Sequence, residues 1–91
     1  MNKTSGKKWV KFEFNAHPKS EVFVAGTFND WNDRKMKLKE EDAGVYQTSL
    51  LVPPGRHEYK FIVDGRWCPD PNCGERVSNA LGSQNSVINV G

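Results

Sequence analysis

Trp67 and Lys60 are the residues whose types and spacing most clearly favour a chemistry, because they stand on either side of the dipeptide Asp64-Gly65. Asp-Gly between two apolar runs predicts a two-residue type I′ hairpin, in which both turn residues have positive φ. Such a turn pairs Ile62 with Trp67, and the two-residue period of a strand puts Lys60 on the same sheet face. The hairpin therefore places an indole beside an ammonium group, outside the core.

An indole beside a lysine has one functional and one structural interpretation. The flat ring can cover the C–H-rich face of a pyranose while the ammonium group donates hydrogen bonds to sugar hydroxyls. Alternatively, Trp67 packs under a loop and the stem of Lys60 extends over it. The hairpin alone leaves both open. The opposite face of the strand is apolar enough to be the core, and it carries His57, Tyr59, Phe61 and Val63, with Cys68 opposite Phe61.

Two further tryptophans lie outside this hairpin. Trp31 is closely flanked by four Asn and Asp residues, and so it is predicted to lie in a turn. A tryptophan on a turn can fold back as a lid on the core or project outward as a binding surface, and composition favours neither. Trp9 opens the first strand out of phase with its apolar residues, which favours packing at a sheet edge.

A third group precedes the last strand and again has two-residue spacing: Leu81, Ser83 and Asn85. In an extended segment these alternate side chains point the same way. They would offer an apolar contact, a hydroxyl and an amide, which suit the recognition of sugar hydroxyls. On its own the trio is more typical of an ordinary loop.

The carboxylates are scattered over turns, which argues against an enzyme. Four of them stand beside Gly, Asn or Pro, where turn chemistry already explains them: Asp30, Asp33, Asp64 and Asp70. Glycoside cleavage needs two carboxylates at a fixed separation and a pocket that raises the pKa of one of them. A domain this short can hardly shelter such a pocket. We therefore expect no catalytic residues, no metal ion and no cofactor.

The elements that must position these residues are short strands. Helical periodicity is absent, and strand patterns occupy residues 10–14, 21–26, 36–38, 45–52, 57–63 and 86–90, separated by turn signals. No strand pattern is found between residues 68 and 85. Short strands with regular turns in a chain of 91 residues predict a single all-β domain, an immunoglobulin-like antiparallel β-sandwich of the early-set type. We expect the sandwich to span residues 9–91 and to follow a flexible segment, residues 1–8.

Charge and composition limit the partners. The chain has 13 Lys and Arg against 11 Asp and Glu, and this balance favours no nucleic-acid partner. No apolar run reaches membrane-spanning length, and the first residues lack the apolar region of a secretory signal. The two cysteines, Cys68 and Cys73, are too few for a disulfide framework and are expected to be reduced. These features predict a cytoplasmic monomer with no membrane partner.

Three segments, residues 22–31, 55–67 and 81–90, together resemble the family-48 carbohydrate-binding modules, and among these the glycogen-binding domains of AMP-activated protein kinase beta subunits. The resemblance covers nearly the whole chain, from Trp9 to Val90, with the motifs in the family's order. It implies a non-catalytic module that binds α-1,4-linked glucan, such as glycogen, starch or maltooligosaccharides, and targets an associated enzyme or kinase to it. The alternative is a structural sandwich that packs on such a protein and binds little sugar itself.

The resemblance also implies a role for each residue of the predicted site. Trp31 and Trp67 correspond to the tryptophans that stack on glucose units, and Lys60 and Asn85 to the groups that hydrogen-bond to the sugar. Leu81 corresponds to the side chain that reaches over the glucan. Ser83 stands where the kinase domains have a threonine, so the hydroxyl is kept and a methyl group is lost.

Overall fold

The computed structural model describes residues 6–79 and 82–91. These residues form eight strands and one short 3-10 helix, η1. In chain order the elements are β1 (Lys8–Asn15), β2 (Val22–Gly26), η1 (Thr27–Asn29), β3 (Lys39–Asp42), β4 (Val45–Val52), β5 (Gly55–Val63), β6 (Arg66–Cys68), β7 (Arg76–Ser78) and β8 (Gln84–Val90).

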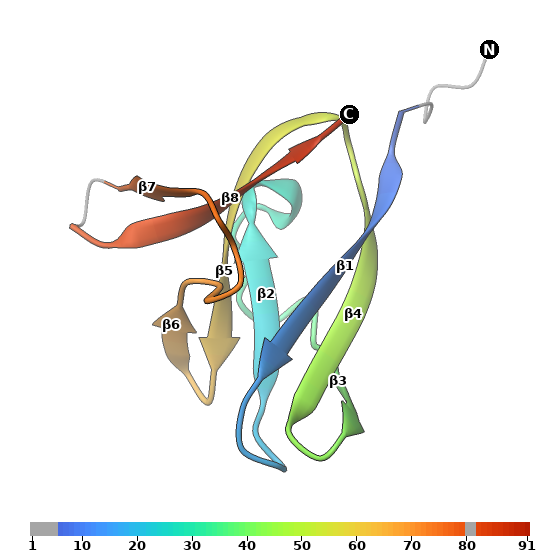
Figure 1. Cartoon of the computed structure of the whole chain (residues 1–91), viewed down its shortest axis with the longest axis vertical. Coiled ribbons are helices and arrows are strands. Elements are labelled where there is room, and N and C mark those ends of the chain that lie inside the picture. The colour runs from blue at the N-terminus through green and yellow to red at the C-terminus, as the bar shows by residue number, and fades with distance from the viewer. Residues whose placement is uncertain (1–5, 80–81) are drawn as a thin grey trace.

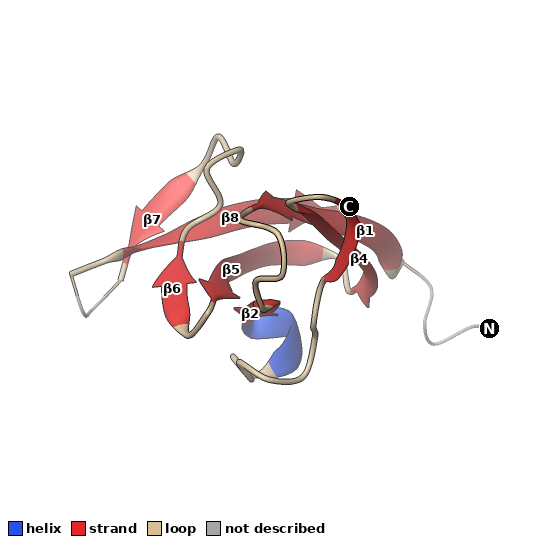
Figure 2. Ribbon diagram, turned by 90° about the horizontal axis from the view of Figure 1, so that it is seen from below, coloured by secondary structure: helices blue, strands red, loops and turns tan. Residues whose placement is uncertain are grey.

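The strands of the described residues form two antiparallel sheets. The smaller sheet has the order β1-β4-β3, and the larger has the order β2-β5-β8-β7, with β6 also paired to β5. Figure 1 shows β1, β3 and β4 on one side of the molecule and the larger sheet on the other, with β7 and β8 reaching outward. Figure 2 shows the helical turn next to β2. The predicted all-β sandwich is confirmed.

The core lies between the sheets and is built from the inward-facing residues of β1, β2, β4 and β5. Phe12 of β1 contacts Tyr59 and Phe61 of β5, with ring centroids 5.1 and 6.5 Å from its own. Alternation along each strand brings these rings to one face, where they exclude water together. The buried cluster consists of Phe12, Val22, Val24, Leu38, Tyr46, Leu50, Val52, Tyr59, Phe61 and Val90.

The hairpin of β5 and β6 has the predicted turn and register. Asp64 and Gly65 both have positive φ, 49° and 85°, as a type I′ turn requires. Ile62 lies opposite Trp67, and Phe61 lies opposite Cys68. The local sequence therefore determines which face of the larger sheet carries Trp67.

The segment predicted as a strand at residues 36–38 has a different role. Lys37 makes only an isolated bridge with Phe23, although the N–H of Val24 donates to the carbonyl of Met36 and the N–H of Leu38 to that of Val22, at 3.0 and 2.8 Å. The regular strand, β3, begins one residue later and pairs with β4 in the other sheet. The chain thus passes from one sheet to the other at Leu38, whose side chain is buried.

Residues 68–85 contain a strand that the sequence did not predict. β7 has only three residues and pairs with β8, which begins at Gln84 rather than at Ser86. Three residues with one apolar side chain, Val77, are too short to show a strand period. Pairing with β8 therefore determines the conformation of this segment more than its own sequence does.

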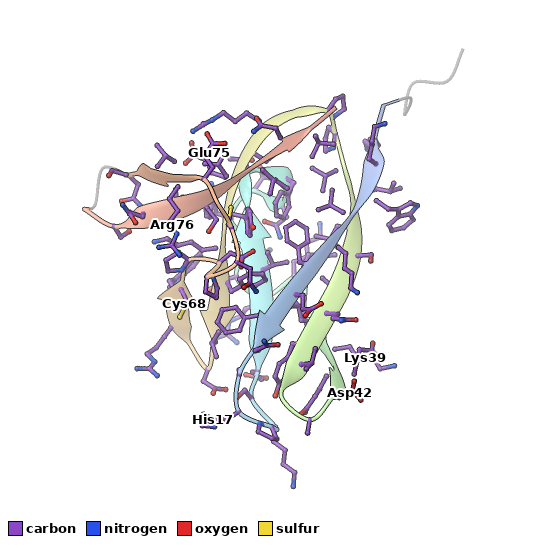
Figure 3. All side chains as sticks on the ribbon, in the orientation of Figure 1. His17, Lys39, Asp42, Cys68, Glu75 and Arg76 are labelled. Atoms are coloured by element: carbon purple, nitrogen blue, oxygen red, sulfur yellow. The ribbon has the colours of Figure 1, made fainter. Side chains whose placement is uncertain are left out.

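Asp70 holds the loop between β6 and β7 against the larger sheet. Its buried carboxylate accepts hydrogen bonds from the Tyr59 hydroxyl at 2.6 Å and from the N–H of Asn72 at 2.9 Å, and its own N–H donates to Ser86 Oγ at 2.8 Å. Burial and the bond to Asp70 both raise the pKa of Tyr59 above its ordinary value, so the hydroxyl stays a donor. Figure 3 shows the end of this stretch, Glu75 and Arg76, close to β8.

Four smaller predictions concern Trp9, the two cysteines, the N-terminal segment and membrane-spanning length. Trp9 lies on the outer face of β1 and is 70% exposed, so the expected packing at the sheet edge does not cover it. Both cysteines are free thiols. Residues 1–5 of the segment predicted to be flexible lie outside the described residues, and β1 begins at Lys8. The helical part of the described chain is a single three-residue turn, too short to span a bilayer.

Candidate functional site

A hollow of about 440 Å³ lies over the outer face of the larger sheet. Its lining comes from five parts of the chain, namely the turn after η1, β5, β6, the connection between β7 and β8, and β8 itself. Five of the six residues predicted from the sequence lie here, and Asn79 joins them. The lining residues are Trp31, Lys60, Trp67, Asn79, Ser83 and Asn85. The sixth predicted residue, Leu81, lies outside the described residues.

A strained turn positions Trp31. Asp30 and Trp31 both have positive φ, 56° and 57°, which is uncommon for residues other than glycine. The Asn29 side chain holds the turn, because its Oδ1 accepts from the N–H of Gly26 at 2.9 Å and its Nδ2 donates to the carbonyl of Val24 at 3.1 Å. The N–H of Trp31 donates to the carbonyl of Gly26 at 2.9 Å. These contacts direct the indole toward the hollow instead of the core.

Trp31 and Trp67 form one bent apolar wall. Their ring centroids are 6.4 Å apart and their planes are inclined by 43°. Trp67 is 44% exposed, and Trp31 is half-buried. Of the two interpretations left open for Trp31, the structure supports a surface position, because Trp31 lines the hollow and is not a member of the core cluster.

Lys60 forms the floor of the hollow. It lies on the same sheet face as Trp67, as the register predicts, but it is only 7% exposed. Its Nζ donates a hydrogen bond to Ser83 Oγ at 2.8 Å. The two indoles and the β7–β8 connection line the same hollow as Lys60. In such surroundings a charge–dipole contact is less screened than in open water.

Asn85 is buried and holds its amide in place through two protein contacts. Its Nδ2 donates to Glu58 Oε1 at 2.9 Å, and its Oδ1 accepts from Asn79 Nδ2 at 3.2 Å. The pKa of Glu58 is lowered, chiefly by the bond from Asn85 and further by Arg56, while partial burial opposes the shift. Glu58 is therefore a carboxylate near neutral pH, and an acceptor only.

Sequence reasoning did not identify Asn79 or Glu58. Glu58 had a usable signal, because it is two residues from Lys60 on β5 and so shares its sheet face. Asn79 had no such signal, because its position depends on β7, which the sequence does not predict. Asn79 lies across from Ser83, and its N–H donates to the carbonyl of Ser83 at 2.9 Å.

The side chains that line the hollow are suited to apolar contact and hydrogen bonding. The residues that line it bring two indoles, an ammonium group, a hydroxyl and two amides, with no carboxylate and no imidazole among them. Within residues 6–79 and 82–91, no group of three His, Cys, Asp or Glu side chains is placed to hold a metal ion. An apolar wall above convergent hydrogen-bonding groups matches a pyranose, which has C–H-rich faces and a rim of hydroxyls.

Comparison with known proteins agrees with this chemistry. Residues 9–91 match the sequence profile of a family described as the glycogen recognition site of AMP-activated protein kinase. The chain is 40% identical over 70 residues to the mouse 5'-AMP-activated protein kinase subunit beta-2, a match that covers 77% of the chain and 25% of that protein.

Two plant proteins are also similar to the chain. One is protein PTST homolog 2, chloroplastic, from Arabidopsis thaliana, 46% identical over 52 residues that cover 57% of the chain and 10% of that protein. The other is protein FLOURY ENDOSPERM 6, chloroplastic, from Oryza sativa subsp. japonica, 37% identical over 75 residues that cover 82% of the chain and 14% of that protein. The chain spans a quarter or less of these three relatives.

The two plant relatives correct one prediction from the sequence. The names of both proteins place them in the chloroplast, so the predicted cytoplasmic location is wrong. Because the matched segment covers only 10% and 14% of these proteins, its composition carries little information on compartment.

Proposed function

Because the chain belongs to the family of glycogen recognition sites of AMP-activated protein kinase, we propose that its hollow binds α-1,4-linked glucan without cleaving it. The family is a carbohydrate-binding module, a non-catalytic domain. The observation that carries the proposal is that the wall of Trp31 and Trp67 lines one hollow together with Lys60. Glycogen, starch and maltooligosaccharides share this glucan chain and are the expected ligands.

Each residue of the hollow has a distinct task in this proposal. The indoles of Trp31 and Trp67 cover the apolar faces of glucose units. Lys60, Ser83 and Asn85 hydrogen-bond to sugar oxygens. Leu81, which the family resemblance brings to the site, adds an apolar contact over the glucan.

The expected affinity is modest. An indole covers about 75–100 Å² of sugar on one face, which at about 25 cal/mol per Å² contributes roughly 2 kcal/mol. Two indoles and a few net hydrogen bonds of about 1 kcal/mol each must offset an association cost of at least about 4 kcal/mol. The balance gives a single-site Kd between about 10 μM and 1 mM for maltooligosaccharides. Weak sites suit a polymer, because many equivalent chain segments raise retention.

In a longer protein, a module that binds glucan would serve to target that protein to the polymer. A module of this kind, joined to an enzyme or a kinase complex, would hold that partner on the polymer, and the relatives include a kinase subunit. The second candidate is a structural sandwich that packs on a glycogen- or starch-processing protein. The presence of Trp31, Trp67 and Lys60 in one hollow favours the binding module, because a packing surface would not need two rings together with an ammonium group.

Titration with maltoheptaose, followed by tryptophan fluorescence and calorimetry, tests the proposal. Trp67→Ala and Trp31→Ala should each raise Kd at least about tenfold, because each removes roughly 2 kcal/mol of apolar contact. Trp9→Ala is the matched control: this indole is 70% exposed on the other sheet and should leave Kd unchanged. No binding by the intact protein would favour the structural sandwich. Equal, measurable affinity in the wild type, Trp67→Ala and Trp31→Ala would mean that the sugar does not stack on these two indoles.

A further inference from the structure

A continuous chain of hydrogen bonds runs beneath the indole wall from one charged group to another. Lys60 Nζ donates to Ser83 Oγ at 2.8 Å, and Asn79 Nδ2 donates to the same oxygen at 2.9 Å. Asn79 Nδ2 also donates to Asn85 Oδ1 at 3.2 Å, and Asn85 Nδ2 donates to Glu58 Oε1 at 2.9 Å. The chain thus begins at an ammonium group and ends at a carboxylate.

The two charged ends determine the direction of every bond between them. A carboxylate only accepts, so the Asn85 amide must turn its NH₂ group to Glu58 and its carbonyl oxygen to Asn79. An ammonium group only donates, so Ser83 Oγ accepts from Lys60. Because Ser83 Oγ accepts from both Lys60 and Asn79, its own proton is left to donate outward.

Glu58 is itself held from the other side. Arg56 Nη1 donates to Glu58 Oε2 at 3.0 Å, so the two carboxylate oxygens have different partners. The side chains of Arg56 and Glu58 are 48% and 28% exposed, so solvent screens this ion pair and its contribution to folding is small. Glu58 can orient the Asn85 amide even though the ion pair with Arg56 adds little to the stability of the fold.

From this geometry we infer that Glu58 is a positioning residue for glucan binding: it orients the Asn85 amide and, with Lys60 at the other end, makes the hollow a surface of hydrogen-bond donors. The inference rests on the proposed function, and it adds that the site presents hydrogen-bond donors to the glucan. The groups left to meet a ligand are the ammonium N–H bonds of Lys60, the hydroxyl proton of Ser83 and the second Nδ2–H of Asn85, since only one N–H of that amide is needed for the bond to Glu58. The hollow therefore recognises sugar oxygens as acceptors.

Two substitutions at one position separate this role from charge. Glu58→Leu removes the acceptor for Asn85, and Glu58→Gln removes the charge but keeps an amide oxygen that can accept. We expect Glu58→Leu to raise the Kd for maltoheptaose about fivefold and Glu58→Gln to leave it within about twofold of the wild-type value. Glu41→Leu, the same change at an exposed site on β3, is the control for lost charge and should bind like the wild type.

The Asn85 side-chain amide gives a readout in the free protein. In ¹⁵N-resolved NMR spectra its hydrogen-bonded proton should move upfield in Glu58→Leu and stay near its wild-type position in Glu58→Gln. An unchanged Asn85 amide in Glu58→Leu would overturn the inference, as would equal losses of affinity in the two Glu58 variants. If the wild type binds no maltoheptaose, the proposed function fails, while the amide signals still decide whether Glu58 orients Asn85. Similar melting temperatures for both variants would show that folding does not cause the difference.

Discussion

Lys60 is the residue of the site whose position is least expected from its type. A lysine is rarely buried without a partner, because removing its ammonium group from water is unfavourable. Here Nζ has Ser83 Oγ at 2.8 Å, and no carboxylate lines the hollow in the described chain. Because no carboxylate of the described residues neutralises the ammonium group of Lys60, its remaining N–H bonds can donate to sugar oxygens that replace water.

Lys60→Met tests this arrangement. We expect the Kd for maltoheptaose to rise about tenfold, since the strongest donor of the hollow is lost. The free energy of unfolding should stay within about 1 kcal/mol of the wild-type value or increase, because a methionine of similar length replaces a buried charge. Calorimetric titration and thermal melting measure the two quantities. Lys39→Met, at an exposed lysine of β3 that Figure 3 labels, is the control. Equal affinity losses in both variants would point to net charge alone.

At the scale of elements, two turns are each held by a side chain that bonds to backbone groups, but only one of these turns carries a residue of the site. The Asn29 side chain bridges the backbone of Gly26 and Val24 and so supports the strained turn of Trp31. The Tyr46 hydroxyl donates to the carbonyl of His17 at 2.6 Å and accepts from the N–H of Ser20 at 2.8 Å, at the turn between β1 and β2. The two side chains therefore stabilise loops of the same fold with different consequences for binding.

Asn29→Ala and Tyr46→Phe should make this difference measurable. Each leaves partly buried backbone groups without their partners, and each should lower the free energy of unfolding by about 1–2 kcal/mol. Only Asn29→Ala should also weaken maltoheptaose binding, by about threefold to tenfold, because Asp30 and Trp31 lose the support for their positive φ values. Denaturant unfolding and calorimetry on the same samples provide the comparison. Equal binding by the two variants would mean that the Trp31 turn keeps its shape without Asn29.

The elements also show which parts of the structure the sequence determines locally. The β5–β6 hairpin was predictable to the residue because Asp64-Gly65 fixes its turn and the alternation of its strands fixes its faces. β7 was not, because three residues carry no period and depend on pairing with β8. The burial of Lys60 was also beyond prediction. It follows from the return of Ser83 to β5, a contact across 23 residues.

Within the site, the predicted residues came from two sources of different strength. The pairing of Lys60 with Trp67 followed from strand geometry alone. The inclusion of Trp31, Ser83 and Asn85 followed from the family resemblance, because nothing local fixes the direction of a tryptophan on a turn or of a residue in a loop. Asn79 was missed because its position depends on the pairing of β7 with β8. The strand period could have placed Glu58 on the face of Lys60, but its contact with Asn85 on β8 could not be predicted locally.

At the scale of the whole molecule, two carboxylates couple the stability of the fold to pH. Glu40 accepts from the N–H groups of Gly44 and Lys19 at 2.9 and 3.2 Å, so it ties the β3–β4 turn to the turn before β2. The bond from Gly44, then that from Lys19, lowers the pKa of Glu40 below its ordinary value of 4.5. The pKa of Glu58 is lowered mainly by its bond from Asn85. These two groups lie in different sheets.

The folded state should therefore be less stable in acid. A carboxyl group whose pKa is lower in the folded state takes up its proton first in the unfolded state as pH falls. Its stabilisation is complete above the unfolded value of 4.5 and is lost as pH falls through the lower folded value. We expect the melting temperature to be insensitive to Glu40 and Glu58 between about pH 5.5 and 7 and to fall below about pH 4.5.

Glu40→Gln separates one contribution from the general effect of acid. A neutral amide keeps one acceptor but has no titrating proton, so the variant should melt below the wild type near pH 7, and the two curves should converge as pH falls below about 4.5. Calorimetric melts from pH 7 to 2.5 measure this convergence, and Glu41→Gln, at an exposed carboxylate next in the chain, is the matched control. A constant offset between wild type and Glu40→Gln across the acidic range would show that folding does not shift the titration of Glu40.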